Sequence, residues 1–82
     1  MNDIIPLPED APKVGERFRH YKGRHYEVFE LAFHENDHEW MVVYKPLYDD
    51  AGAHLFVRPF REWNERIEWE GGFVKRFTRF DV

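Results

Sequence analysis

Cysteine is absent from this chain of 82 residues, so a disulfide framework and a thiolate metal site are both excluded. Long apolar runs are also absent, and no stretch approaches the roughly 20 apolar residues that a membrane-spanning helix needs. The first residues, MNDIIPLPEDAPK, lack both the basic start and the apolar core of a secretory signal peptide. We therefore expect a cytoplasmic protein with no membrane partner.

Catalytic motifs are missing as well. The chain contains no nucleophile elbow, no phosphate-binding glycine loop and no zincin motif. His34 and His38 share an acidic turn, but a flexible turn does not pre-organise the about three or four converging ligands that zinc requires. Glu68 and Glu70 flank Trp69, yet paired carboxylates perform acid–base chemistry only in a cleft that separates their pKa values. We expect no enzymatic activity, no bound metal and no cofactor.

Aromatic residues, by contrast, are abundant: eight phenylalanines, four tyrosines and three tryptophans. Large rings let a short chain bury enough surface to fold, since burial contributes about 25 cal/mol per Å² of apolar area. The length fits one domain near the small end of what folds alone. We assign residues 14–82 to a single small β domain, and residues 1–13, with Pro6, Pro8 and Pro12, to an extended acidic leader.

The stretch GERFRHYKGRHYEV, residues 15–28, predicts a β-hairpin. A two-residue loop would split its apolar residues between the two faces of the hairpin. A three-residue loop over 21–23 pairs Phe18 with Tyr26 and gathers the apolar residues on one face, and such alternation sets the register. Gly23 then occupies the last loop position, where a type I turn followed by a bulge needs a left-handed residue. We therefore predict the three-residue loop.

Further strands are predicted along the rest of the chain. Alternation fails near Phe29, which indicates a bend or bulge in the second strand. The apolar run at 40–44 fits a strand covered on both sides, and Pro46 marks its end because proline cannot donate a ladder hydrogen bond. After the first strand of the hairpin, the predicted strands cover about 24–33, 40–44, 54–58 and 73–80. The fold class is mainly β, either a small SH3-like barrel, the first choice, or a curled antiparallel sheet with one short helix.

The short helix is predicted to open at Pro59, since proline suits the first helical position. Phe60, Trp63 and Ile67 are spaced to share one helical face. Glu62 and Arg66 are spaced as a surface ion pair four residues apart. Gly71-Gly72 then predicts a turn into the last strand.

Short motifs along the chain resemble a known family. They are Gly15, HYKG at 20–23 with Tyr26, Val43-Tyr44 with Leu47-Tyr48, VRP at 57–59 and RF at 76–77. In this order they resemble the small bacterial family called "domain of unknown function 1653", over about residues 14–77. Phe33 departs from that family, which usually has small residues at this place. The resemblance supports the β fold and points to residues, but it implies no reaction.

Charge is distributed unevenly, although the chain as a whole carries a net charge of −4. Residues 13–28 contain five lysines and arginines against two glutamates, which gives the hairpin a basic character. Rings interleaved with arginines can stack nucleobases or hold a peptide. The alternative is that the rings form the core and the arginines lie over it. The candidate binding residues are Arg19, His20, Tyr21, Lys22, Arg24, Tyr26, Tyr44, Arg58 and Arg76, of which Tyr21, at a turn, should be exposed.

These observations predict a non-catalytic β module that binds a protein or a peptide. The alternative is a nucleic-acid-binding module that uses the basic hairpin, with Arg19, Lys22, Arg24 and Arg76. The acidic pI of about 5.7 counts against that alternative. An enzyme is the third and weakest hypothesis, and the oligomeric state stays open.

Overall fold

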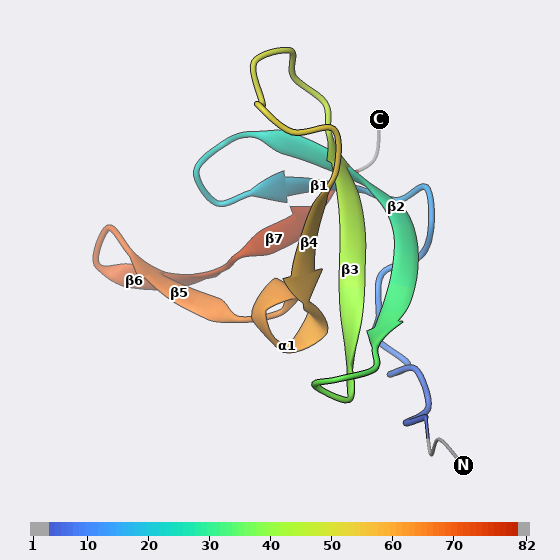
Figure 1. Cartoon of the computed structure of the whole chain (residues 1–82). Coiled ribbons are helices and arrows are strands. Elements are labelled where there is room, and N and C mark those ends of the chain that lie inside the picture. The colour runs from blue at the N-terminus through green and yellow to red at the C-terminus, as the bar shows by residue number, and fades with distance from the viewer. Residues whose placement is uncertain (1–3, 81–82) are drawn as a thin grey trace.

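The computed structural model describes residues 4–80, which form two antiparallel sheets and one short helix (Figure 1). The elements are β1 (Arg17–His20), β2 (His25–His34), β3 (Glu39–Pro46), β4 (Phe56–Pro59), α1 (Phe60–Trp63), β5 (Arg66–Trp69), β6 (Gly72–Lys75) and β7 (Phe77–Arg79). Five strands make one sheet in the order β4-β3-β2-β1-β7, and β5 and β6 make a separate hairpin.

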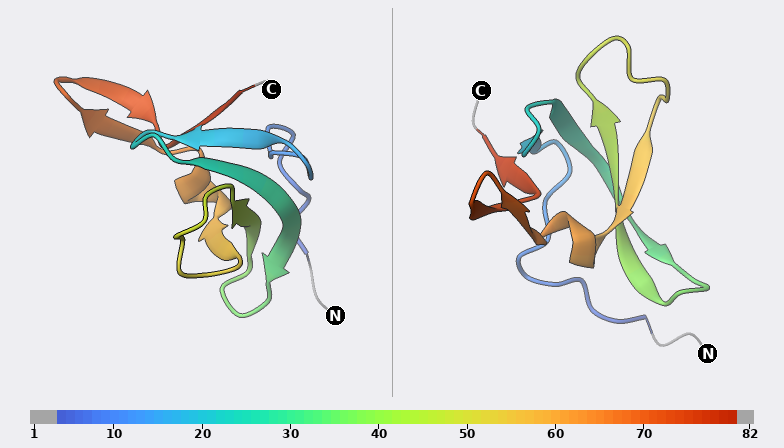
Figure 2. Two further views of the ribbon diagram at one scale, coloured as in Figure 1. Left: turned by 90° about the horizontal axis from the view of Figure 1, so that it is seen from above. Right: turned by 90° about the vertical axis from the view of Figure 1, so that its left-hand side faces the viewer.

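The larger sheet is curled, and the β5–β6 hairpin projects from one side of it (Figure 2). Strands β4 and β7 lie at opposite ends of the strand order, and within residues 4–80 they do not pair with each other. The sheet therefore does not close into the SH3-like barrel that was the first choice from the sequence. The second choice, a curled antiparallel sheet with one short helix, describes the fold.

The β1–β2 hairpin has the predicted register. Phe18 lies opposite Tyr26, and the backbone N–H of His20 donates to the carbonyl of Arg24 at 2.8 Å. The N–H of Gly23 donates to the carbonyl of His20 at 2.7 Å, and the φ of Gly23 is 108°. The three-residue loop and its left-handed glycine are thus confirmed.

Strands β2 and β3 form the longest pairing of the sheet. Its register shifts between Val28 and Glu30, which confirms the predicted bulge near Phe29. Strand β3 ends at Pro46, as expected, and Val42 within it is fully buried. Strand β4 begins at Phe56, so the strand predicted from residue 54 starts two residues too early.

The helix is shorter than predicted. It covers Phe60–Trp63, and Asn64 already lies outside it, with its N–H bonded to the carbonyl of Phe60 at 3.3 Å. Ile67 belongs to β5, so its placement on a helical face was wrong. The predicted pair of Glu62 with Arg66 was wrong for the same reason.

Glu62 instead meets Arg58, four residues before it, at 3.1 Å. Glu62 therefore forms an ion pair with a residue four positions away, but this pair spans the junction of β4 and α1. The reason is that the chain leaves the helix after one turn to enter the β5–β6 hairpin.

The predicted last strand, 73–80, is broken at Arg76 into β6 and β7, which pair with different partners. At the break the N–H of Arg76 donates to the carbonyl of Glu65 at 2.8 Å, and its carbonyl accepts from the N–H of Tyr21 at 2.9 Å. The hairpin turn before β6 lies at Glu70-Gly71, with φ of 51° and 83°, one residue earlier than predicted.

The core lies inside the curl of the sheet and is mostly aromatic. Its buried members are Phe18, Val28, Val42, Tyr44, Trp63 and Phe77. The rings of Trp63 and Phe77 stack with centroids 3.8 Å apart and planes 10° apart. Residues 4–13 of the leader also contact the domain, because Pro12 is buried and Trp40 Nε1 donates to the carbonyl of Ile5 at 2.8 Å.

The loop glycine supplies a stability test. A Cβ added at Gly23 would meet no atom within 4 Å, so its cost comes only from the left-handed backbone. We expect Gly23→Ala to lower the free energy of unfolding by about 1 kcal/mol, measured by urea denaturation. Gly72→Ala is the matched control, since its Cβ also meets nothing and its φ is not left-handed. A loss at Gly23 no larger than that at Gly72 would contradict the assigned turn.

Candidate functional site

A cleft of about 320 Å³ lies between the tip of the β1–β2 hairpin and the β5–β6 hairpin, with β7 at its base. We call it the inter-hairpin cleft. Its lining residues are Arg19, His20, Tyr21, Trp69, Val74, Lys75, Thr78, Arg79 and Phe80. Three of the nine candidate residues from the sequence, Arg19, His20 and Tyr21, therefore come together here.

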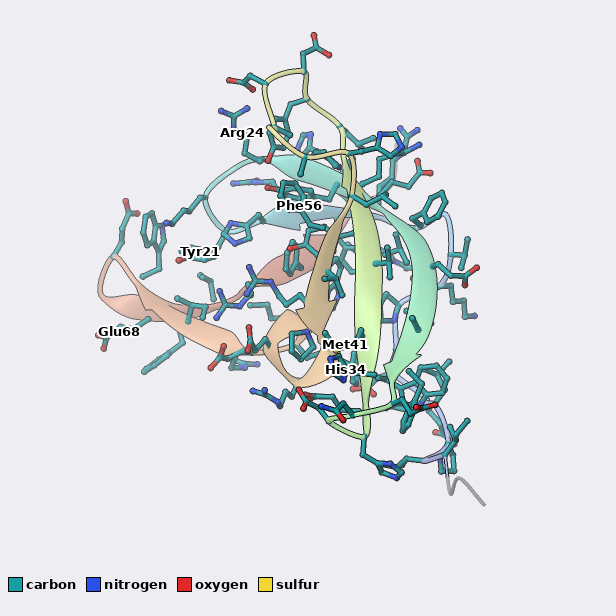
Figure 3. All side chains as sticks on the ribbon, viewed as in Figure 1. Tyr21, Arg24, His34, Met41, Phe56 and Glu68 are labelled. Carbon is teal, nitrogen blue, oxygen red and sulfur yellow. The ribbon has the colours of Figure 1, made fainter. Side chains whose placement is uncertain are left out.

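Two rings from different hairpins meet at this cleft. Tyr21 lies in the β1–β2 loop, on the side that faces the β5–β6 hairpin (Figure 3), and its ring meets Trp69 edge-on with centroids 5.0 Å apart. Tyr21 is consequently half-buried, whereas its turn position predicted exposure. Trp69 keeps 40% of its surface exposed. At this side of the cleft, Trp69 is held in place by Tyr21 and still exposes apolar surface.

The charges that line the cleft all have one sign. Arg19, Lys75 and Arg79 contribute cations, and none of the described lining residues is a carboxylate. Arg79 is bonded to Glu16 at 2.8 Å. The side chains of Arg19 and Lys75 have no hydrogen-bond or ion-pair partner within residues 4–80. The cleft thus offers two cations whose charge is not locally neutralised.

A second group of candidates packs around Phe77, inside the curl of the sheet. The ring of His20 meets that of Phe77 at 5.1 Å, and Tyr44 meets it at 5.5 Å. Arg58 reaches the hydroxyl of Tyr44 with its Nε at 3.4 Å, and Tyr26 packs against Tyr44 at 5.2 Å. These side chains belong largely to the core, which favours the structural interpretation for Tyr26 and Tyr44.

Arg24 and Lys22 lie elsewhere on the hairpin. The guanidinium of Arg24 stacks on the ring of Tyr48 at 4.3 Å and pairs with Asp50 at 3.1 Å. The hydroxyl of Tyr48 is hydrogen-bonded to that of Tyr26 at 2.8 Å. Burial, and then this hydrogen bond, raise the pKa of Tyr26 well above its ordinary value of 10. The contacts with Tyr48 and Asp50 join Arg24 to the β3–β4 loop. Lys22, by contrast, is exposed beside the ring of Tyr21.

Arg76 is bound to the end of the helix. Its Nε donates to the carbonyl of Glu62 at 3.0 Å, and its Nη2 meets Glu65 at 2.6 Å. The side chain is only 18% exposed. This geometry favours a structural role, because a helix end leaves carbonyls without partners inside the helix.

The residues that the sequence interpretation missed are those contributed by the β5–β6 hairpin and β7. Trp69, Lys75 and Phe80 join the cleft only because the chain bends at Arg76. The one local signal was Trp69, a large ring beside a turn in an otherwise charged segment.

His34 and His38 form no metal cluster, since no group of three or more potential ligands gathers within the described residues. No helix in residues 4–80 has the length and apolar character to cross a membrane.

Truncating Arg76 tests its structural role. Arg76→Ala removes the charged donor to the carbonyl of Glu62, which then keeps only the N–H of Glu65 at 3.2 Å. We expect the loss of this charge-assisted hydrogen bond to cost about 1–3 kcal/mol of the free energy of unfolding. The control is Arg61→Ala in α1, which removes only ion pairs at the surface. We expect it to lower the free energy of unfolding by about 0.5 kcal/mol or less. Chemical denaturation of both variants provides the comparison, and equal losses would leave Arg76 as a surface residue.

His20 has a second, electrostatic signature. Burial, and then the charges of Arg58, Arg76 and Lys22, lower its pKa from 6.5 to about 4. Its Nδ1 also accepts the backbone N–H of Lys22 at 3.2 Å, which only an unprotonated nitrogen can do.

The pH dependence of stability follows from this shift. The depressed pKa of His20 means that, between pH 6.5 and about 4, the unfolded state binds a proton that the folded state excludes. The contribution of His20 to stability is therefore complete above pH 6.5 and declines as the pH falls toward 4. We expect the free energy of unfolding to fall more between these pH values in the wild type than in His20→Asn. An NMR titration of the imidazole with a midpoint near 6.5 would refute the shift.

Comparison with known proteins gives a family and a structural relative. A family model described as "Protein of unknown function (DUF1653)" matches residues 16–79. A crystal structure of a protein of that family from Bordetella bronchiseptica is similar, with 40% sequence identity and a TM-score of 0.70. The similarity covers 79% of this chain and 82% of the Bordetella chain. No curated protein matches the sequence.

Proposed function

The chain belongs to the DUF1653 family, whose function is unknown, and we propose that it is a non-catalytic module that binds a segment of a partner protein in the inter-hairpin cleft. The observation that supports this most is the pairing of Tyr21 with Trp69, which come from separate hairpins and meet at the cleft. Exposed rings on a supported frame are the typical anchors of protein recognition.

The size of the cleft agrees with this class of ligand. A volume of about 320 Å³ is at the lower end of ligand pockets, and it suits one or two side chains of a bound segment. The rest of such a segment would lie across the neighbouring surface. Trp69 and Val74 share one face of the β5–β6 hairpin, and they are 40% and 36% exposed. This face forms an apolar wall of the cleft.

Nucleic acid is the second candidate, because the cleft combines rings with the cations Arg19 and Lys75. A polyanionic strand extends beyond a single cleft, however, and Glu68 and Glu70, next to Trp69 in the chain, add negative charge to this hairpin. The net charge of −4 opposes it further. A titration with a thymidine oligonucleotide separates the two candidates, since binding to a phosphate backbone falls steeply with salt.

The β5–β6 hairpin offers a matched pair of variants. Trp69 lies at the cleft, whereas Phe73, 67% exposed, lies on the opposite face of the same hairpin. We select peptides from a random display library on the immobilised protein and measure their affinities by calorimetry. Trp69→Ala should weaken binding by about tenfold or more, as expected for an anchor ring, and Phe73→Ala should leave it within about twofold.

Thermal melting of both variants accompanies the binding assay, because a misfolded hairpin would also lose binding. Peptides that bind equally well to Trp69→Ala would place the binding surface elsewhere. Failure to select any peptide, together with tight and salt-sensitive binding of the oligonucleotide, would favour nucleic acid instead.

A further inference from the structure

The two cations of the inter-hairpin cleft approach it from different elements. Arg19 extends from β1, on the outer face of the sheet, where it lies opposite Thr78 of β7. Lys75 ends β6, immediately before the bend at Arg76. The register places it on the hairpin face opposite to that of Trp69, and it lines the cleft from the end of the strand. Because neither side chain is paired within the described residues, a ligand group that meets them does not have to displace an internal carboxylate.

The third cation of the cleft differs from these two. Arg79 is held by Glu16 at 2.8 Å, in a neighbouring cleft that is also lined by Lys75. Its charge is therefore offset by a neighbouring carboxylate. Arg19 and Lys75 are thus the two residues that set the preference of the cleft for an anion.

Apolar side chains share the cleft with these cations. Trp69, Val74 and Phe80 line the same cleft. Tyr21 supports Trp69 from the side. A ligand that fits both parts carries a negative group next to an apolar side chain.

We propose that the inter-hairpin cleft binds an acidic protein segment, which places an aspartate or glutamate carboxylate against Arg19 and Lys75 and an adjacent apolar side chain against Trp69. This inference rests on the proposed function and specifies its ligand. A short acidic segment satisfies the charge of the two cations without a long run of negative charge. It can therefore bind although the chain as a whole is acidic.

Lys75 and Arg66 form the matched pair for the test. They are cross-strand partners on one face of the β5–β6 hairpin, and both are exposed. Only Lys75 lines the cleft. Lys75→Gln and Arg66→Gln change the net charge equally, so long-range electrostatics alter both variants to the same degree. Neither variant adds a carboxylate beside the other position. Arg19→Gln serves as a second cleft variant.

The experiment uses the displayed random peptides and the full chain. Peptides selected by the wild type should be enriched in aspartate and glutamate over the input library. Replacing that acid by its amide should weaken binding by about fivefold or more, and Lys75→Gln should weaken it to a similar degree, since both changes leave a desolvated charge unpaired. Arg66→Gln should stay within about twofold of the wild type, as expected for a charge that does not line the cleft.

Two outcomes overturn the inference in different ways. Peptides that depend on Trp69 but show no acidic enrichment, and that bind Lys75→Gln normally, would refute the acidic ligand and leave the proposed function standing. Peptides that are acidic but insensitive to Trp69→Ala would refute the site itself. Equal losses in Lys75→Gln and Arg66→Gln would reduce the effect to net charge alone and would also refute the proposal.

Discussion

The bend at Arg76 is the constraint on which the rest of the structure depends. Its backbone joins Glu65 on one side and Tyr21 on the other, and its side chain holds the carbonyl of Glu62. One residue therefore links the end of α1, the tip of the β1–β2 hairpin and the start of β7. Without the bend, β6 would continue into β7 as one strand, and no cleft would separate the two hairpins.

The residue after the bend connects this corner to the core. Phe77 is 2% exposed and stacks on Trp63, which the short helix supplies. Stacked and edge-on rings contribute about 0.5–1.5 kcal/mol beyond the area that they bury. In a small domain with a total stability of about 5–15 kcal/mol, such contacts are a substantial share. The open side of the sheet between β4 and β7 is therefore stabilised by rings, where a barrel would use strand pairing.

Features that depend on short-range sequence patterns, such as the hairpin register and the bulge, were predicted correctly from the sequence. Alternation around Phe18 and Tyr26 gave the correct hairpin register, because a slip of one residue would have exposed the core face. The loss of alternation near Phe29 located the bulge. Both predictions needed only neighbours in the chain.

Long-range contacts decided what the sequence could not show. Ile67 has helical spacing from Trp63, yet the helix ends because the chain must turn toward β5. Nothing local marks Arg76 as a corner, since its partners are Glu62, Glu65 and Tyr21. The cleft was missed for the same reason, and only its hairpin half, Arg19 to Tyr21, was identified beforehand.

The projecting β5–β6 hairpin links binding to folding. A two-stranded hairpin is marginally stable by itself in water, so its position requires support from the body of the protein. The contact between Tyr21 and Trp69 and the bonds of Arg76 supply this support. A ligand that packs on Trp69 favours the same arrangement, because it adds contacts that exist only when the hairpin lies over the tip of β1–β2. Removing the ring of Tyr21 would therefore weaken binding through the position of Trp69, even for a ligand that never touches Tyr21.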